Sequence, residues 1–575
     1  MTVHLAAVLL YCLLLGTALA TPRAFVREGK VTYTGVYQSS VEAFLGIAYG
    51  QDSGGENRFK PPKPYVPARG ATITAHAAGP ACPQATGATG LPLYLSNITH
   101  ISEDCLHLNI TRPNGTKATD RLPVMVYIHG GGFSSSSKDE LTTQPSGLIL
   151  QSIANGHPVM VVGINYRLAA FGFAVSDALI NEGSANAGLK DQRLALEWVR
   201  DNIGYFGGDP IKVTIFGQSS GGLAVGMQIM AYGASKAAPF QQAICESQAL
   251  EPGITGNFTK LAMQRLVDAV GCNITSLQSN DTVACLRKLS MEQLLTAQTN
   301  TYQGGAADNL GDIWLPAVDG DFLPDAPTTL ITQGRFANVT AMIGWCEDDT
   351  TPFTDATIET ANDTAAFVSA YAPGLTEPNL KTLLSLYPIQ EFTADPKGNL
   401  SAQFYRSARI LRDILMVCQP IHYGQAIAKA GNDLFYYEQN QTIATEVLDS
   451  LGSPGLGVVH TSEFAYVFGN LSHYDADGFP YHPNASDFAL SDRESRSWST
   501  FASLGFPSLV GHDTLKGWTP SFARPNETDI FVIGGPHEGL SAEDGPRSER
   551  AVEAQKLRER CGFINSPDVI KQWNY

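Results

Sequence analysis

One serine on a glycine-bounded turn constrains this sequence more than any other feature. Ser219 lies in a Gly-x-Ser-x-Gly pattern at residues 217–221, directly after the apolar run of residues 213–216. A strand that breaks into a helix at such a pattern lifts the serine hydroxyl above a parallel sheet. Residues 221–230, which are mostly small and apolar, fit a helix that packs closely behind Ser219.

A second glycine motif lies upstream of this serine. The glycines of residues 130–132 follow His129 and the apolar run of residues 124–128. Their bare backbone N–H groups can approach a developing oxyanion. Either motif alone is weak evidence, because glycine-rich runs and Gly-x-Ser-x-Gly patterns also arise by chance. In this order, and each behind a predicted strand, the two motifs together predict serine-based acyl transfer.

Apolar runs that alternate with helical patterns indicate the fold class. Short strands are expected within residues 31–49, and longer apolar runs occupy residues 122–128, 158–165, 213–216, 242–245, 340–344 and 433–437. Such continuous apolar strands, separated by helices such as residues 188–203, predict an α/β fold whose large, mostly parallel sheet is covered on both faces. Helical patterns over residues 250–310 and 355–430 predict insertions that cap the sheet and shape the substrate entrance.

The N-terminus predicts secretion. Residues 5–19 form an apolar run that ends at Ala18-Leu19-Ala20, and small residues of this kind precede signal cleavage. We therefore expect a signal peptide at residues 1–20 and a single domain at residues 21–575. Because His4 is the one weakly basic residue at the start, an N-terminal membrane anchor is the alternative. No later run predicts a membrane span, so no stable membrane insertion is expected.

The composition indicates which compartment to expect for this chain and which partners to exclude. With a formal net charge of -17 and no basic cluster, the chain is not expected to bind nucleic acid or an anionic membrane. Of 9 cysteines, Cys12 lies in the predicted signal, which leaves an even number for an oxidising compartment. The sequence also contains Asn-x-Ser/Thr sequons typical of a glycoprotein, which begin at Asn97, Asn109, Asn114, Asn257, Asn273, Asn280, Asn338, Asn362, Asn399, Asn440, Asn470, Asn484 and Asn526.

A serine hydroxyl needs a base to take its proton, and that base needs a carboxylate to fix its tautomer. His460 is the favoured base, because the glycine-rich apolar residues 455–459 precede it. The other late histidines lie in more polar surroundings: His473, His482, His512 and His537. Glu347, Asp348 and Asp349 follow the run that ends at residue 346, and chemistry alone leaves the choice among these acids open.

These segments resemble the type-B carboxylesterase/lipase family, which includes the cholinesterases, and most of all its secreted fungal carboxylesterases and lipases. Besides the two glycine motifs, the matching segments are residues 58–62, 102–109, 165–168, 188–193 and 202–210. The resemblance covers nearly the whole mature chain. It implies an α/β-hydrolase fold and the hydrolysis of a small-molecule or lipid carboxylic ester, with no metal and no cofactor.

Carried over by position, the resemblance implies that Ser219 is the nucleophile and His460 the base. The family's acid falls at Asp349, where most similar members have Glu, and Asp348 is the alternative. The implied oxyanion donors are the backbone N–H groups of Gly131, Gly132 and Ser220. Family members usually have Ala at position 220, and the sequence offers no explanation for the added hydroxyl.

Other residues match supporting positions of the family. Ser247 matches a serine that supports the triad, although an ordinary turn residue fits it equally well. Glu463 matches a buried carboxylate three residues beyond the base. The resemblance pairs Cys82 with Cys105, Cys272 with Cys285 and Cys418 with Cys561. Cys245 and Cys346 are then either a fourth bridge or two buried thiols. Arg58 and Glu103 resemble a structural ion pair.

The loop of residues 83–104 bears on the substrate. It contains no Trp, so a choline ester specialist is disfavoured. Its apolar residues 91–95 suit a lipase lid, but the loop is short, which favours a general carboxylesterase over the alternative, a triacylglycerol lipase. A non-catalytic adhesion module of the same fold is disfavoured because Ser219 is present. The natural ester, the chain-length preference and the oligomeric state are left open.

Overall fold

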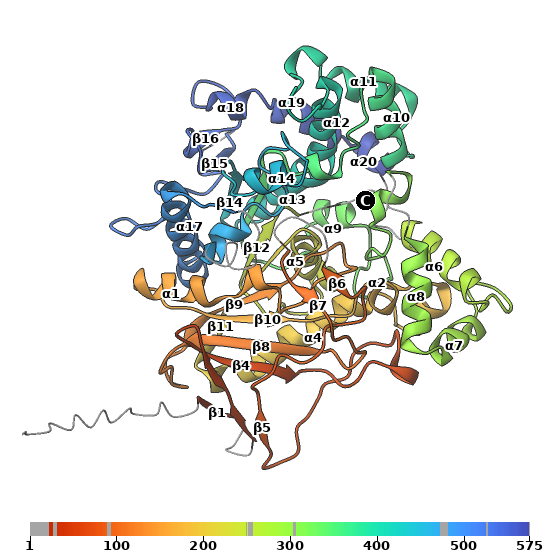
Figure 1. Ribbon diagram of the computed structural model, residues 1–575, viewed down its shortest axis with the longest axis vertical. Coiled ribbons are helices and arrows are strands. Elements are labelled where there is room, and N and C mark those ends of the chain that lie inside the picture. The colour runs from red at the N-terminus through yellow and green to blue at the C-terminus, as the bar shows by residue number, and fades with distance from the viewer. Residues whose placement is uncertain are drawn as a thin grey trace, which may run out of the picture.

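The computed structural model describes residues 22–26, 31–88, 94–248, 250, 257–302, 306–471, 481–524 and 527–573. Its centre is an 11-stranded sheet with the order β16-β15-β14-β13-β12-β11-β9-β10-β8-β4-β3 (Figure 1). The strands are β3 (Val36–Gln38), β4 (Val41–Ala48), β8 (His107–Pro113), β9 (Leu122–Ile128), β10 (Met160–Ile164), β11 (Gly208–Gln218), β12 (Gln242–Glu246), β13 (Thr340–Cys346), β14 (Leu434–Gln439), β15 (Asp529–Ile533) and β16 (Gly539–Ala542).

Strands β9 to β15 run parallel to one another, and antiparallel strands flank them at the two edges. A parallel strand covered on both faces is apolar along its whole length, which is why these strands appear as continuous apolar runs. The predicted α/β fold with a mostly parallel sheet is confirmed. The remaining strands form two small sheets: β1 (Arg23–Val26), β2 (Val31–Thr34) and β5 (Thr72–Thr74), and β6 (Gly87–Ala88) with β7 (Asn97–Ile98).

Helices cover both faces of the sheet, as the alternation along β9 shows. Val124, Val126 and Ile128 pack into a core with α4 (Ala187–Asn202) and α5 (Ser220–Met230). Met125 and Tyr127 face the opposite core, which includes α1 (Ser146–Ala154) and α17 (Ala485–Leu504). The other helices are α2 (Ala169–Phe173), α3 (Asp177–Asn181), α6 (Asn257–Ala269), α7 (Asn280–Lys288), α8 (Met291–Thr301), α9 (Pro327–Thr332), α10 (Ala361–Tyr371), α11 (Glu377–Ser385), α12 (Ala402–Arg412), α13 (Cys418–Lys429), α14 (Thr445–Ser450), α15 (Phe464–Val467), α18 (Arg550–Glu553), α19 (Leu557–Ile564) and α20 (Pro567–Trp573).

The helical insertions form two groups beside the sheet. Helices α6, α7 and α8 lie together at one side, and α10, α11 and α12 lie together at another (Figure 1). The structure contains the three disulfides implied by the family resemblance: Cys82–Cys105, Cys272–Cys285 and Cys418–Cys561. Cys245 and Cys346 are both buried free thiols. Within the described residues, no helix combines the length and apolarity needed to cross a membrane.

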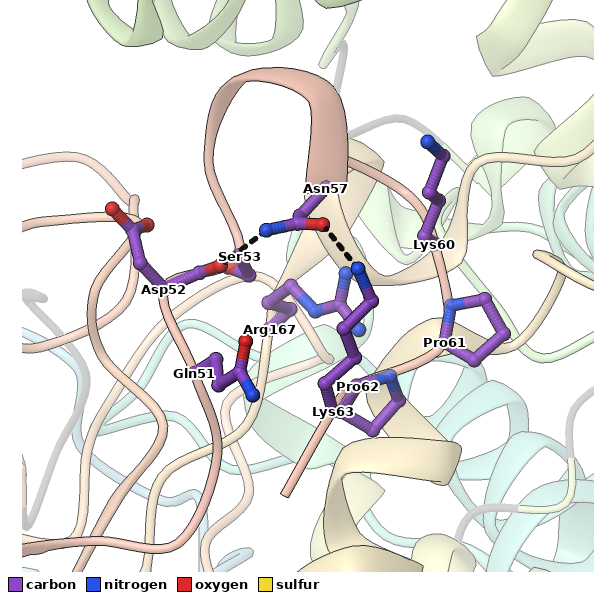
Figure 2. Close-up of a pocket in the computed structure, with 9 residues that line it drawn as sticks. All are labelled: Gln51, Asp52, Ser53, Asn57, Lys60, Pro61, Pro62, Lys63 and Arg167. Atoms are coloured by element: carbon purple, nitrogen blue, oxygen red, sulfur yellow. Dashed lines mark hydrogen bonds between the residues drawn. The ribbon is translucent and has the colours of Figure 1, made fainter. Parts of the chain in front are cut away.

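A buried ion pair joins α4 to the loop that follows β10. The Arg167 guanidinium donates to both carboxylate oxygens of Asp191, at 2.8 and 2.7 Å, and the side chains are only 2% and 0% exposed. Figure 2 shows the small cavity beside Arg167, with a volume of about 10 Å³, room for about one water. Its other lining residues are Gln51, Asp52, Ser53, Asn57, Lys60, Pro61, Pro62 and Lys63. Residues 51–63 thus enclose the Arg167 side chain, which is paired with a single carboxylate, that of Asp191.

The predicted ion pair of Arg58 with Glu103 is also present, at 2.6 Å.

The Arg167–Asp191 pair yields a stability prediction. We expect Asp191→Asn to lower the free energy of unfolding by about 3–5 kcal/mol, because it leaves a guanidinium buried without its counter-charge. Asp201→Asn is the matched control, since its pair with Arg200 is exposed, at 59% and 48%, and should cost less than about 1 kcal/mol. Urea denaturation of both variants checks this, and equal losses would contradict the interpretation.

Candidate active site

The turn between β11 and α5 holds Ser219 in a strained backbone conformation, with φ 61° and ψ −129°. The Ser219 N–H donates to the Glu246 carbonyl at the end of β12, at 2.9 Å. Glycine is required on both sides of the turn: a Cβ on Gly217 or Gly221 would lie 2.5 or 2.2 Å from the carbonyl oxygen of Ile128. The predicted strand–turn–helix is therefore present, with Ser219 half-buried and within reach of solvent.

The glycine loop after β9 lies directly on this turn. A Cβ on Gly130 would be 3.1 Å from the Ser219 Cβ and 3.2 Å from the Tyr94 hydroxyl. Gly131 and Gly132 have φ values of 99° and 61°, which side chains disfavour. Within the described part of the chain, no group accepts a hydrogen bond from the N–H of Gly131, Gly132 or Ser220. Three backbone donors therefore lie beside the serine with no acceptor among the described residues.

Asp349 and His460 form a hydrogen-bonded pair at the same edge of the sheet. His460 Nδ1 lies 2.7 Å from Asp349 Oδ1, and the two side chains are 8% and 0% exposed. The second carboxylate oxygen accepts from the Ser247 hydroxyl at 3.0 Å and from the Cys346 N–H at 2.8 Å. These contacts hold Asp349 in one orientation, with Nδ1 of the imidazole as its donor.

Asp348 points away from the imidazole and fixes the loop that carries it. Its carboxylate accepts from the Val458 N–H at 3.1 Å, and its own N–H donates to the Val458 carbonyl at 3.0 Å. The hydroxyls of Thr351 and Tyr405 donate to the carbonyls of Leu456 and Gly455, at 2.6 and 2.8 Å. Three hydrogen bonds therefore join the acid loop to the histidine loop besides the Asp349–His460 contact, and the Tyr405 hydroxyl adds a fourth from α12.

Gln218 and Phe353 contact the imidazole, and the sequence analysis missed both roles. The Gln218 amide nitrogen lies 3.2 Å from Nε2 and 3.5 Å from Nδ1 of His460. Such similar distances to both ring nitrogens place the amide across the face of the ring. Phe353 meets the ring edge-on, with centroids 5.3 Å apart. The position of Gln218 directly before Ser219 was the one available signal, and it did not specify a contact.

A group of buried carboxyls lies beneath this pair. Burial, together with the charges of Asp349 and Glu246, raises the pKa of Glu463 to about 8. Burial likewise raises the pKa of Glu246 to about 7. The Cys346 thiol donates to Glu463 Oε2 at 3.2 Å, while Glu463 Oε1 has no hydrogen-bond partner among the residues that the structure describes. Burial lowers the pKa of His460, but the hydrogen bond and charge of Asp349, aided by Glu463, outweigh it, so the net shift is upward.

The middle of the loop of residues 83–104 is fixed beside the site at residues 94–96. The Tyr94 ring packs edge-on against Phe464, with centroids 5.7 Å apart. Glu140 accepts hydrogen bonds from the backbone N–H groups of Leu95 and Ser96, at 2.8 and 3.2 Å. Residues 91–93 of the predicted lid lie outside the described residues.

The other late histidines that the structure describes have partners elsewhere. His512 Nδ1 lies 3.0 Å from the Asn155 carbonyl, and His537 pairs with Glu549 at 3.4 Å. His482 is exposed, and His473 lies outside the described residues.

Comparisons with known proteins identify the family and the fold of this chain. A model of the carboxylesterase family matches residues 20–553. A secreted lipase of Arthroderma benhamiae is 50% identical over 99% of this chain and 99% of its own length. An inactive carboxylesterase-like protein of Byssochlamys spectabilis, VdtD, is 35% identical over 95% of this chain and 94% of its own. The crystal structure of Aspergillus niger EstA has a TM-score of 0.77 at 24% identity, covers 97% of this chain and 99% of EstA, and supports the fold alone.

The buried Glu463 yields a pH prediction. An unfolded glutamate releases its proton near pH 4.5, whereas folded Glu463 keeps it to about pH 8. The stability that Glu463 contributes is therefore complete below about pH 4.5 and is lost as the pH rises through about 8. Glu463→Gln stays neutral, so we expect its melting temperature relative to the unsubstituted protein to rise between pH 5 and 8, on the order of a few degrees.

Calorimetry at several pH values measures this difference. The exposed Glu446→Gln controls for the change in net charge. Parallel melting curves for Glu463→Gln and the unsubstituted protein across this range would contradict the prediction.

Proposed function

The chain belongs to the carboxylesterase family, and from that premise we propose that it is a serine hydrolase of carboxylic esters with Ser219, Asp349 and His460 as its triad. The observation that carries the proposal is the 2.7 Å contact between His460 Nδ1 and Asp349 Oδ1 beside the Ser219 turn. Family membership alone is insufficient support, since the relative VdtD is named as inactive. The N–H groups of Gly131 and Gly132, which have no acceptor among the described residues, support the proposal because catalysis also needs an oxyanion hole.

The mechanism follows from these positions. Ser219 Oγ attacks the ester carbonyl while His460 Nε2 takes its proton, and Asp349 stabilises the resulting imidazolium. The N–H groups of Gly131, Gly132 and Ser220 are proposed to hold the tetrahedral oxyanion. His460 then protonates the departing alcohol, leaving an acyl-enzyme. Water, deprotonated by the same imidazole, attacks this ester and releases the carboxylic acid and Ser219. The chemistry requires no metal or cofactor.

We include the location and organisation of the chain in the proposal. A signal peptide at residues 1–20, cleavage after Ala20 and secretion are supported by the name of the Arthroderma benhamiae relative and by three disulfides. Residues 21–575 are proposed to form one α/β-hydrolase domain, supported by a sheet whose strands come from residues 36–542. Glycosylation at exposed sequons belongs to the same proposal, whereas the Asn109 amide is buried and donates to Asp139 at 2.7 Å.

A general carboxylesterase is the first candidate and a triacylglycerol lipase the second. The short loop of residues 83–104, whose middle Glu140 holds at Leu95 and Ser96, favours the esterase. The relative that is 50% identical is named a secreted lipase, which favours the lipase. A non-catalytic adhesion module of this fold is disfavoured, because the proposed nucleophile, base and acid are all present.

Ser219→Ala tests the nucleophile. We expect kcat on a soluble aryl ester to fall on the order of 10⁶-fold, the scale for a triad nucleophile, while the melting temperature changes little. An organophosphonate should label the unsubstituted protein at Ser219, as peptide mass spectrometry would establish. Ser453→Ala, at an exposed serine, is the control and should keep full activity. Retained hydrolysis by Ser219→Ala would refute the assignment.

Interfacial activation separates the two candidates. For an esterase, we expect the hydrolysis rate of tributyrin to follow the dissolved concentration and to level off at the solubility limit. A lipase would instead show a sharp increase in rate once emulsion droplets form. A pH-stat titration across that limit decides between them.

A further inference from the structure

The hydroxyl of Ser220 has a structural partner that the sequence did not predict. Ser220 is the first residue of α5 and is 3% exposed. Its Oγ accepts a hydrogen bond from the backbone N–H of Phe133 at 3.1 Å, and both groups are buried. Phe133 ends the glycine loop that holds Gly131 and Gly132. One side chain therefore links the start of the helix behind Ser219 to the far end of that loop.

The Tyr166 phenol lies near the same hydroxyl and binds the near end of the loop. Burial raises the pKa of this phenol, and the neighbouring Ser220 side chain opposes that shift. The phenol donates to the His129 carbonyl at 2.7 Å, and its ring stacks on the His129 ring with centroids 4.5 Å apart. Ser220 thus binds the far end of the loop at Phe133, and its neighbour Tyr166 binds the near end at His129.

The surrounding backbone leaves the loop little freedom to move away. The Phe133 carbonyl accepts from the Ala169 N–H at 2.7 Å. A Cβ on Gly130 would lie 2.5 Å from the Gln218 carbonyl oxygen, so the loop is in van der Waals contact with the Ser219 turn. Within the described residues, no other side chain accepts a hydrogen bond from the Phe133 N–H. Removing the Ser220 hydroxyl would leave this buried donor unsatisfied.

We propose that the Ser220 hydroxyl is a positioning device for the oxyanion hole. The inference rests on the proposed function and extends it to a side chain. The Ser220 N–H supplies one donor of the hole, and the Ser220 Oγ fixes the loop that supplies the other two. All three donors are then held in one geometry before the substrate arrives. Stabilisation of an oxyanion depends on such preorganisation, because small displacements of a donor lower the rate.

Ser220→Ala is the central variant, because it removes the hydroxyl and keeps the backbone N–H. We expect kcat on a soluble ester to fall roughly tenfold with KM changed less than about twofold, because donors aimed at the oxyanion act mainly in the transition state. The affinity for an aryl trifluoromethyl ketone, which forms a tetrahedral adduct, should fall by the same factor as kcat. Ser220→Thr retains a hydroxyl and should restore most of the activity.

Tyr166→Phe tests the link through the phenol. We expect a smaller loss of kcat than for Ser220→Ala, and the loss in the double variant should be less than the product of the single losses, because both act on one loop. Hydrogen exchange measured by mass spectrometry gives a readout that needs no activity. Ser220→Ala should speed exchange in the peptide that contains Phe133 and leave the β11 peptide unchanged.

The outcomes separate this inference from the proposed function. If the unsubstituted protein hydrolyses no ester and is not labelled at Ser219, the proposed function fails, and exchange in the Phe133 peptide still decides whether Ser220 holds the loop. Unchanged kcat and unchanged exchange in a folded Ser220→Ala variant would overturn the inference. A rise in KM that accounts for the whole loss of kcat/KM would also overturn it. A matched loss of kcat and ketone affinity, together with faster exchange, supports it.

Discussion

The site depends on one constraint, the adjacency of β9 and β11 as parallel strands. Ile128 pairs with Gly217 at the carboxyl ends of these strands. The glycine loop and the Ser219 turn therefore leave the sheet side by side. The loop and the turn can pack this closely because Gly217 and Gly221 have no Cβ, which would clash with the Ile128 carbonyl. The next strands, β12 and β13, end at the same edge and supply Ser247 and Asp349. This is the crevice where open α/β sheets bind their ligands.

Beneath the site, the protein holds ionisable groups where water cannot reach them. Burial raises the pKa values of Glu246, Glu463 and Glu494, so these carboxyls favour their neutral forms. Asp349 lies near these groups with three donors around its carboxylate: the imidazole, the Ser247 hydroxyl and the Cys346 N–H. These contacts fix the orientation of the side chain that faces the imidazole.

Much of the fold was predictable because buried parallel strands consist of consecutive apolar residues, which are visible in the sequence. Residues 122–128 were predicted as a strand and coincide with β9, and residues 188–203 nearly coincide with α4. Strand β15 was missed, because its four apolar residues, 530–533, do not distinguish a strand from a buried helical segment. The contacts of Gln218 and Phe353 with the imidazole were missed for another reason. A polar or aromatic side chain reveals nothing about its partner until the chain has brought that partner near.

By itself, the sequence determined the local geometry: a strand that must break at Ser219, and glycines that leave N–H groups bare. These features depend on backbone sterics over a few residues, so the residue types and their spacing are enough to predict them. Tertiary structure decided which of two adjacent acids meets the imidazole. Asp349 faces His460, whereas Asp348 binds Val458 and holds the histidine loop. Successive side chains in a turn point in different directions, and their targets lie more than a hundred residues away in the sequence. Only the folded chain fixes such long-range contacts.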